Sequence, residues 1–261
     1  MLAESLVDLL TLEEIDTNLY RAHNPADQFL PNLYGGQVAA QALRAAAATV
    51  DDDRVPHSLH GYFLRPGRAE RPTVLAVDRD RDGRSFSARH VNAIQEGKVI
   101  FSGLASFHVE EPGVDHQVPA IDADAGDPES MAEGERTGHN VLLDLRYPSA
   151  PEDQPWRSGQ FWVRPRGDIP DDPVTRACVL TYLSDLGWAF GSLEAARGYG
   201  GPSLDHSVWL QRRVDVSGWV FVDLRPVTLA GSRGVFTGTI HDRAGTLAAY
   251  LTQESLLRGQ E

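Results

Sequence analysis

The chain has 261 residues, of which 41% are hydrophobic, and this is enough for one large domain or two small ones with a real core. Its 37 acidic and 24 basic residues give a formal net charge of -13, which argues against nucleic acid and anionic membrane surfaces as main partners. An anionic small molecule is not excluded, because it needs only a few local arginines.

The first residues do not resemble a targeting signal. Residues 1–15 contain Glu4 and Asp8 and lack a basic n-region. No apolar run approaches the length of a membrane span. Cys178 is the only cysteine, which excludes an internal disulfide and suits a reducing compartment. We therefore expect a soluble cytoplasmic protein without membrane insertion.

The first half predicts one helix followed by four strands. The helix covers residues 34–48, opens on Gly35 and Gly36, and carries very small side chains that favour close packing against a sheet. Alternating patterns predict strands at 57–64, 73–81, 85–95 and 99–109. Between the second and third strands, Asp82 and Gly83 predict a hairpin turn, because this pair readily adopts the positive φ angles that such turns need.

An acidic segment separates the two halves. Residues 111–140 hold eight acidic side chains against one arginine, with several Pro and Gly. This composition cannot bury much surface, so we expect an exposed linker. The predicted organisation is a first unit over residues 1–110, an acidic connector over 111–155 and a second unit over 156–261.

The second half repeats the order of the first. A strand is predicted at 162–165 and a helix at 173–186, with Asp171 or Asp172 as its N-cap. Strands are predicted at 203–212, 219–230, 234–242 and 246–257. One helix followed by an antiparallel meander, present twice, indicates an α+β fold in which a sheet wraps around a central helix.

A weak internal repeat relates the ends of the two halves. Each half has a strand, a glycine turn and a second strand, with the turns at Gly97 and Gly245. Aligned on these glycines, Ala105 and Gln253 both fall eight residues after the turn, and alternation places each on an apolar face. A buried amide costs free energy unless it finds hydrogen-bond partners. The first half therefore reads as scaffold, and the second as the half that carries polar function.

Several motifs are spread along both halves. They are Tyr34-Gly35-Gly36-Gln37, residues 57–67, residues 81–89, Tyr182-Leu183-Ser184-Asp185, residues 203–209 and Gln253-Glu254. Their order and spacing cover nearly the whole chain apart from the acidic connector, so the combination is specific although each motif alone is weak. Together these motifs resemble the acyl-CoA thioesterase II family of the TesB type. The resemblance implies a double hotdog fold, two tandem units that each wrap an antiparallel sheet around a central helix.

The resemblance also implies a reaction and a site. The family hydrolyses acyl-CoA thioesters to the free acid and coenzyme A without a covalent acyl-enzyme, and it needs neither a metal nor a cofactor. The catalytic group would be Asp185, Ser203 and Gln253, which orient and activate a water. Ser203 departs from the threonine that is common in the family, but it keeps the hydroxyl. A homodimer or homotetramer is implied as well.

The residues themselves support these assignments unequally. Asp185 falls on the apolar stripe of its predicted helix, where a carboxylate needs a hydrogen-bonding reason, although it could be solvated near the helix end. Gln253 could be a buried structural amide, and Ser203 could simply begin a strand. Gly35 and Gly36 most simply allow close backbone approach, but their amides could also stabilise an oxyanion at the helix N-terminus.

Other polar residues receive structural interpretations. Asp205 and His206 point to opposite faces of their strand, so we expect structural roles or, at most, support of the residues that contact substrate. No spacing of His, Cys and carboxylates resembles a zinc site. Cys178 reads as a small core residue, and no Gly-x-Ser-x-Gly elbow is present. The candidates for contacting the phosphates of coenzyme A are Arg65, Arg84, Arg89 and Arg233.

Two other functions remain open from the sequence. An acyl-CoA hydratase or dehydratase of the hotdog fold would need a positioned histidine with a carboxylate, which the opposite-facing Asp205 and His206 do not provide. A non-catalytic acyl-CoA-binding protein would lack the catalytic residues, yet all three positions are filled here. Release of free thiol from acyl-CoA would distinguish these functions.

Overall fold

The computed structural model describes residues 5–24, 32–122, 125–136, 138–148 and 159–259. The first half contains α1 (Leu6–Leu9), β1 (Leu12–Asp16), β2 (Leu19–Ala22), α2 (Gly35–Ala47), β3 (Arg54–Phe63), β4 (Thr73–Asp82), β5 (Phe86–Gln95) and β6 (Lys98–Val109). The second contains β7 (Leu143–Arg146), β8 (Gln160–Pro165), α3 (Pro173–Leu183), β10 (Asp205–Leu210), β11 (Val220–Ala230), β12 (Arg233–Asp242) and β13 (Leu247–Leu256). Short β9 (Tyr199–Gly200) and β14 (Arg258–Gly259) pair with each other.

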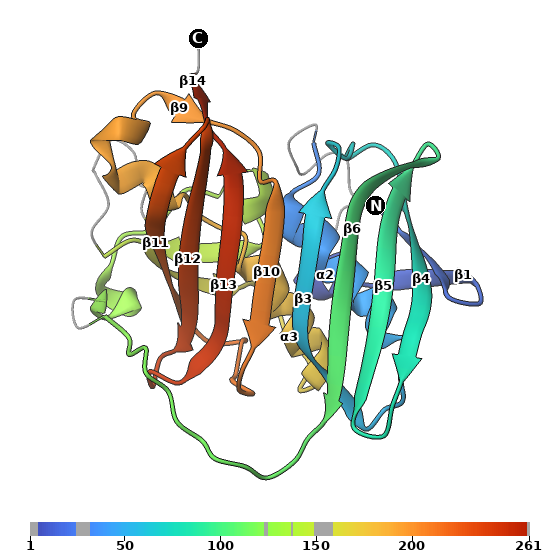
Figure 1. The fold of residues 1–261 in the computed structure, drawn as a ribbon. Helices are drawn as coiled ribbons and strands as arrows, with labels where there is room; N and C mark the ends of the chain where they lie inside the picture. Colours follow the sequence, from blue (N-terminus) through green and yellow to red (C-terminus); the bar gives the residue numbers. More distant parts are fainter. Residues whose placement is uncertain (1–4, 25–31, 123–124, 137, 149–158, 260–261) are drawn as a thin grey trace.

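One continuous antiparallel sheet joins the two halves. Its order is β1-β2-β4-β5-β6-β3-β10-β13-β12-β11-β8-β7, so β3 and β10 meet at the centre. Leu59 of β3 lies opposite Val208 of β10 within this pairing. Figure 1 shows α2 and α3 together on one face of the sheet. This arrangement confirms the double hotdog, in which each unit supplies a sheet edge to the other.

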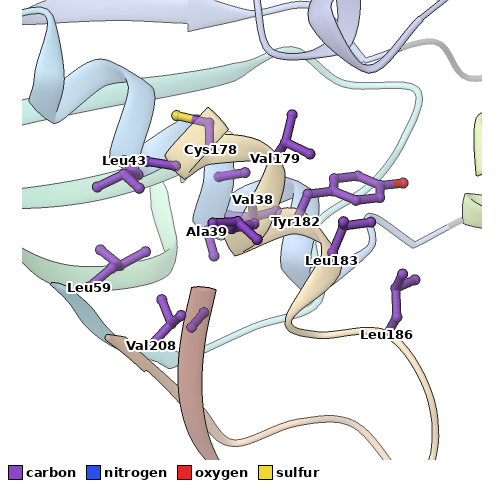
Figure 2. Close-up of a cluster of buried hydrophobic side chains, with 14 of the residues drawn as sticks. Val38, Ala39, Leu43, Leu59, Cys178, Val179, Tyr182, Leu183, Leu186 and Val208 are labelled. Atoms are coloured by element: carbon purple, nitrogen blue, oxygen red, sulfur yellow. The ribbon is translucent and has the colours of Figure 1, made fainter. Parts of the chain in front are cut away.

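The core lies between the two helices and the sheet. Figure 2 shows Val38 and Leu43 from α2 meeting Cys178 and Tyr182 from α3, above Leu59 of the central strands. Seven small or medium residues of α2 are almost fully buried, and they are Val38, Ala39, Ala40, Ala42, Leu43, Ala45 and Ala46. Small side chains let the helices approach each other closely, which brings the end of α3 near the start of α2.

Local signals explain most element boundaries. Helix α3 begins after Asp172, whose side chain accepts a hydrogen bond from Thr175 N at 2.8 Å, and Pro173 stands at its first position. The β4–β5 hairpin forms as expected, with Gly83 N donating to Phe86 O at 2.9 Å. However, Gly83 is absent from the positive-φ residues, so the predicted Asp-Gly geometry at this turn is wrong.

The connector is bound to the second half along part of its length. Residues 111–116 are exposed as expected. Beyond them, the side chain of Gln117 donates to Gly245 O at 2.8 Å and accepts from Leu247 N at 2.9 Å. Further on, Ala125 is buried in a small cluster and accepts a hydrogen bond from Trp162 Nε1 at 2.7 Å.

Part of the range expected for the connector packs with the second half. Strand β7 falls inside the range expected for the connector, yet Leu143 and Leu145 are buried and the strand pairs with β8. Residues 149–158, which include part of the expected boundary, lie outside the described residues. In the part of the chain that is described, no helix is long and apolar enough to cross a membrane.

Candidate active site

The three predicted catalytic residues meet in the folded chain. Gln253 Nε2 donates a hydrogen bond to Ser203 Oγ at 2.6 Å. Ser203 Oγ in turn donates to Asp185 Oδ1 at 3.5 Å. These side chains come from β13, from the residues before β10 and from the turn after α3. A carboxylate, a hydroxyl and an amide thus face one another.

Asp185 lies beyond the helix rather than on it. Helix α3 ends at Leu183 with Ser184 as its C-cap, and Leu186 N bonds to Leu183 O. The placement of Asp185 on a helical stripe is therefore wrong, because the predicted helix ran three residues too far. The turn after the helix instead directs the carboxylate toward the other half of the chain.

The carboxylate contacts the N-terminus of α2. Gly36 N donates to Asp185 Oδ2 at 2.7 Å, which joins the first half to the site. A Cβ on Gly35 would lie 2.6 Å from Asp185 Oδ2, and a Cβ on Gly36 would lie 2.6 Å from Tyr182 O. Both glycines therefore allow a close approach, to the end of a movable side chain at Gly35 and to a fixed backbone carbonyl at Gly36. The Gly36 amide is committed to Asp185, which differs from its expected use as an oxyanion donor.

Burial raises the pKa of Asp185 above its ordinary value of 3.8. The positive charge that His206 can carry, and hydrogen bonds from Gln253, Gly36 and Ser203, act in the opposite direction without cancelling the effect of burial. A carboxylate with a raised pKa holds a proton more strongly and is a better general base than a solvated one.

Gln253 and Ser203 are held by the sheet. Gln253 is 4% exposed on the inner face of β13, whereas the repeat places Ala105, 2% exposed, at the equivalent position of β6. The expected asymmetry between the halves is thereby confirmed. Ser203 forms an isolated β-bridge with Ser255, two residues before β10 begins. This bridge places its hydroxyl next to the amide of Gln253.

His206 lies against the proposed catalytic residue Gln253, which the sequence did not suggest. It is 1% exposed on the inner face of β10, with Nδ1 against Gln253 Oε1 and Nε2 2.7 Å from Ser184 Oγ. The next pair along the two strands, Ser207 and Thr252, are direct partners, so His206 faces Gln253. Asp205 accepts from Glu254 N at 2.7 Å, in keeping with a structural role.

The end of the connector is attached beside the site. Tyr34, the N-cap of α2, stacks on His139 with ring centroids 4.3 Å apart, and its hydroxyl donates to Tyr182 O at 2.9 Å. The hydroxyl of Tyr182 donates to His139 O at 2.9 Å. We call Tyr34, His139 and Tyr182 the aromatic clasp, because they link the connector, α2 and α3.

A cavity of about 270 Å³ lies at the opposite end of the β3–β10 junction. Its lining includes Pro56, Pro173, Arg176 and Leu210, and it contains none of the three predicted catalytic residues. Among the described residues, no group of three or more His, Cys, Asp and Glu side chains is placed to hold a metal ion.

The arginines proposed for coenzyme A differ in availability. Arg89 is 1% exposed, and its guanidinium donates to Asp82 at 2.6 Å and to Thr49 Oγ1 at 2.7 Å. Its proposed role is wrong, because this side chain ties β5 to the segment that follows α2. Arg65, Arg84 and Arg233 are exposed, and Arg233 pairs with Glu254 at 2.8 Å.

Comparison with known families gives matches over both halves. The acyl-CoA thioesterase N-terminal domain matches residues 25–108, and the acyl-CoA thioesterase C-terminal domain matches residues 116–257. Acyl-CoA thioesterase 2 of Haemophilus influenzae is 32% identical over 98% of each chain. Acyl-coenzyme A thioesterase 8 of Homo sapiens is 33% identical over 96% of this chain and 88% of its own.

Solved structures give the same picture. Acyl-CoA thioesterase II TesB2 from Mycobacterium marinum superimposes with a TM-score of 0.83 at 38% identity, covering 98% of this chain and 99% of its own. A hot dog protein of unknown function from Alicyclobacillus acidocaldarius has a TM-score of 0.81 at 17% identity, over 97% and 98% of the two chains, and supports the fold alone.

Proposed function

The chain belongs to the acyl-CoA thioesterase family and hydrolyses acyl-CoA thioesters, and we propose that Asp185, Ser203 and Gln253 activate the attacking water. The observation that carries this proposal is the chain of hydrogen bonds from Gln253 through Ser203 to Asp185, closed by the amide of Gly36. These hydrogen bonds bring together the carboxylate of Asp185, the hydroxyl of Ser203 and the amide of Gln253.

The geometry suits direct attack by water on the thioester carbonyl. Water is a weak nucleophile and must be positioned and partly deprotonated. Asp185 accepts its proton, while Ser203 and Gln253 hold the oxygen on the line of attack. The C–S bond then breaks, coenzyme A leaves as a thiolate, and the proton held by Asp185 neutralises it. Gly35, at the N-terminus of α2, remains our candidate for stabilising the oxyanion.

Thiol release tests the assignment. Wild-type protein is incubated with a panel of acyl-CoAs, and free coenzyme A is measured beside the Ser203→Ala, Ser203→Thr and Gln253→Ala variants. We expect Gln253→Ala to lose kcat, Ser203→Ala to lose less and Ser203→Thr to be tolerated. Near wild-type kcat in both alanine variants would remove the two residues from the mechanism.

Two controls separate the other functions. Mass spectrometry during turnover is expected to show unmodified protein, and a stable acyl adduct would contradict direct water attack. A hydratase would instead change the absorbance of an enoyl-CoA, and a binding protein would bind acyl-CoA without releasing thiol. Either of these results would replace the proposed chemistry.

We propose that a second copy of the chain packs on the outer face of the sheet, the face away from α2 and α3. Tyr62 and Leu104 on β3 and β6 are 62% and 51% exposed there, and Trp209 and Tyr250 form an aromatic pair beside them. Apolar side chains gathered on one sheet face are typical of an interface. We expect light scattering of the wild-type protein to give the mass of a homodimer or homotetramer. The Leu104→Glu variant should give a smaller mass. A wild-type monomer would contradict this assembly.

A cytoplasmic location agrees with the single cysteine, Cys178, which is buried as a free thiol. Cell fractionation of the native host tests this location. Recovery of the protein with the soluble cytoplasmic fraction is expected, and recovery with a membrane or secreted fraction would contradict it.

A further inference from the structure

We propose that His206 is a positioning residue that holds the amide of Gln253 with its N–H side toward Ser203. This inference rests on the proposed function of Gln253. Its basis is a continuous series of contacts that runs from Ser184 to His206, then to Gln253, Ser203 and finally Asp185.

The hydrogens along this series fix the role of His206. Gln253 Nε2 donates to Ser203, so Gln253 Oε1, which can only accept, faces His206 Nδ1. Nδ1 must therefore carry a hydrogen. The hydroxyl of Ser184 lies 2.7 Å from His206 Nε2 and 2.8 Å from Thr181 O. Whether that hydroxyl gives its one hydrogen to Nε2 or to the carbonyl, the requirement at Nδ1 is the same.

The orientation of the amide decides what Ser203 can do. With Nε2 toward Ser203, the serine accepts one hydrogen bond and keeps its own hydrogen for Asp185. If the amide turned over, Oε1 would take that hydrogen and the contact between Ser203 and Asp185 would be lost. An N–H on His206 Nδ1 disfavours the reversed amide, because it would then face the N–H₂ group of Gln253.

The surroundings of His206 agree with this task. Its ring is 1% exposed and held on both sides by the two side chains, so it cannot rotate freely. It lies behind Gln253 and Ser184, so it acts through other residues. The repeat places Ala105 at the position of Gln253, and the first half therefore has no amide to orient there.

Two substitutions test the role. His206→Leu keeps an apolar side chain of moderate size but removes the N–H, and we expect kcat to fall roughly 10- to 100-fold with KM changed less than about threefold. His206→Asn places an amide N–H near the position of Nδ1, and we expect it to recover most of that loss. A purely structural role would be repaired better by Leu than by Asn, so a kcat of His206→Leu that equals or exceeds that of His206→Asn would overturn the inference.

A double-mutant cycle shows whether His206 acts through Gln253. If it does, the kcat of the double variant should be less than about twofold below that of Gln253→Ala alone. Full additivity of the two losses would overturn the inference. If Gln253→Ala alone has no effect, the proposed function of Gln253 fails, whereas a damaged Gln253→Ala with an unaffected His206→Leu refutes this inference alone.

A matched control and a direct measurement complete the design. His90 on β5 makes a similar contact with Ser102 Oγ at 2.9 Å on the outer face, and His90→Leu should leave kcat unchanged. Nitrogen-15 NMR of the wild-type imidazole, assigned with His206→Asn, should show a hydrogen on Nδ1. This measurement decides the matter even if His206→Leu does not fold, because an unprotonated Nδ1 would overturn the inference.

Discussion

At the scale of single residues, the catalytic role proposed for Asp185 comes with a cost to stability. Its pKa is raised by burial, so the folded protein holds this proton to a higher pH than the unfolded chain, which loses it near pH 3.8. Between these two pKa values the folded state binds more protons. The contribution of Asp185 to the free energy of unfolding therefore falls as pH rises through this window.

Asp185→Asn should consequently be at least as stable as wild type at pH 7. The amide can still accept from Gly36 N and carries no buried charge. In thermal unfolding, any excess in the Tm of Asp185→Asn over that of wild type should be greatest at pH 7 and should narrow as the pH is lowered to 4. Each kcal/mol in the free energy of unfolding corresponds to roughly 2–4 °C in Tm. A variant that is clearly less stable than wild type at neutral pH would contradict the assigned cost.

The sequence indicated the proposed catalytic residues more readily than their surroundings. Gln253 stood out because alternation places an amide on an apolar face, and burial confirms it. The role of His206 depends on its partner across β10 and β13, which alternation along one strand cannot supply. The one indication in the sequence was that alternation places His206 on the same strand face as the apolar Val208. The end of α3 was missed because Leu186 falls three residues after Leu183 and continues the helical apolar spacing, and Gly187 follows only after it.

At the scale of elements, the first turn of α2 is shaped by its two glycines. A Cβ on Gly35 would press on Asp185 Oδ2 at 2.6 Å and on Phe63 at 3.0 Å, whereas on Gly36 it would meet the fixed carbonyl of Tyr182 at 2.6 Å. The side chain of Asp185 can move aside more easily than the backbone carbonyl. Alanine should therefore have different effects at the two positions.

Gly35→Ala is expected to keep the fold and lose kcat by on the order of 10-fold or more, since the carboxylate is displaced. Gly36→Ala is expected to lower Tm as well, through overpacking that typically costs about 1–3 kcal/mol. Thermal unfolding and thiol release on both variants check this contrast. Equal, near wild-type values for both would show that α2 is not tightly fitted against the site.

The aromatic clasp should make the protein sensitive to acid. Burial lowers the pKa of His139 from 6.5 to about 4. Between these values the unfolded chain binds more protons than the folded one, so the stability contributed by neutral His139 is lost as pH falls from 6.5 toward 4. His139→Phe keeps an aromatic ring against Tyr34 and should reduce the loss of Tm between pH 7 and pH 5. The matched control is His116→Phe on an exposed part of the connector, and an equal acid response in wild type and both variants would contradict the assignment.

Elements of the two units were predicted with boundaries close to the observed ones, because alternation and glycine turns mark long strands well. Strand β7 was missed for a physical reason. It is only four residues long, and it follows an acidic segment whose composition indicates exposure. The contacts of Gln117 and Ala125 depend on the surface of the second half, which the local sequence does not describe.

At the scale of the whole molecule, the site is built from both halves. The second half supplies Asp185, Ser203 and Gln253, and the first supplies Gly36 and the edge of β3 that pairs with β10. An isolated hotdog unit would leave a strand edge exposed, and pairing of the two halves covers one edge of each. The continuous sheet has this pairing, with β3 beside β10 at its centre.

The isolated second half should therefore be insoluble or inactive, although it holds all three proposed catalytic residues. We expect a fragment covering residues 150–261 to release no thiol from acyl-CoA, because it lacks the amide of Gly36, strand β7 and the partner of β10. Co-expression with residues 1–149 is the control, since it restores every missing contact. A soluble, monomeric and active fragment would show that the first half is dispensable.

The most direct test of the account is the kcat of Asp185→Asn for acyl-CoA hydrolysis at saturating substrate. The substitution keeps the size of the side chain and removes the base, so the fold and KM should persist. We expect kcat to fall by on the order of 100-fold or more, the usual scale for a general base. A folded Asp185→Asn variant with kcat within a few-fold of wild type would contradict the proposal that this carboxylate activates the water.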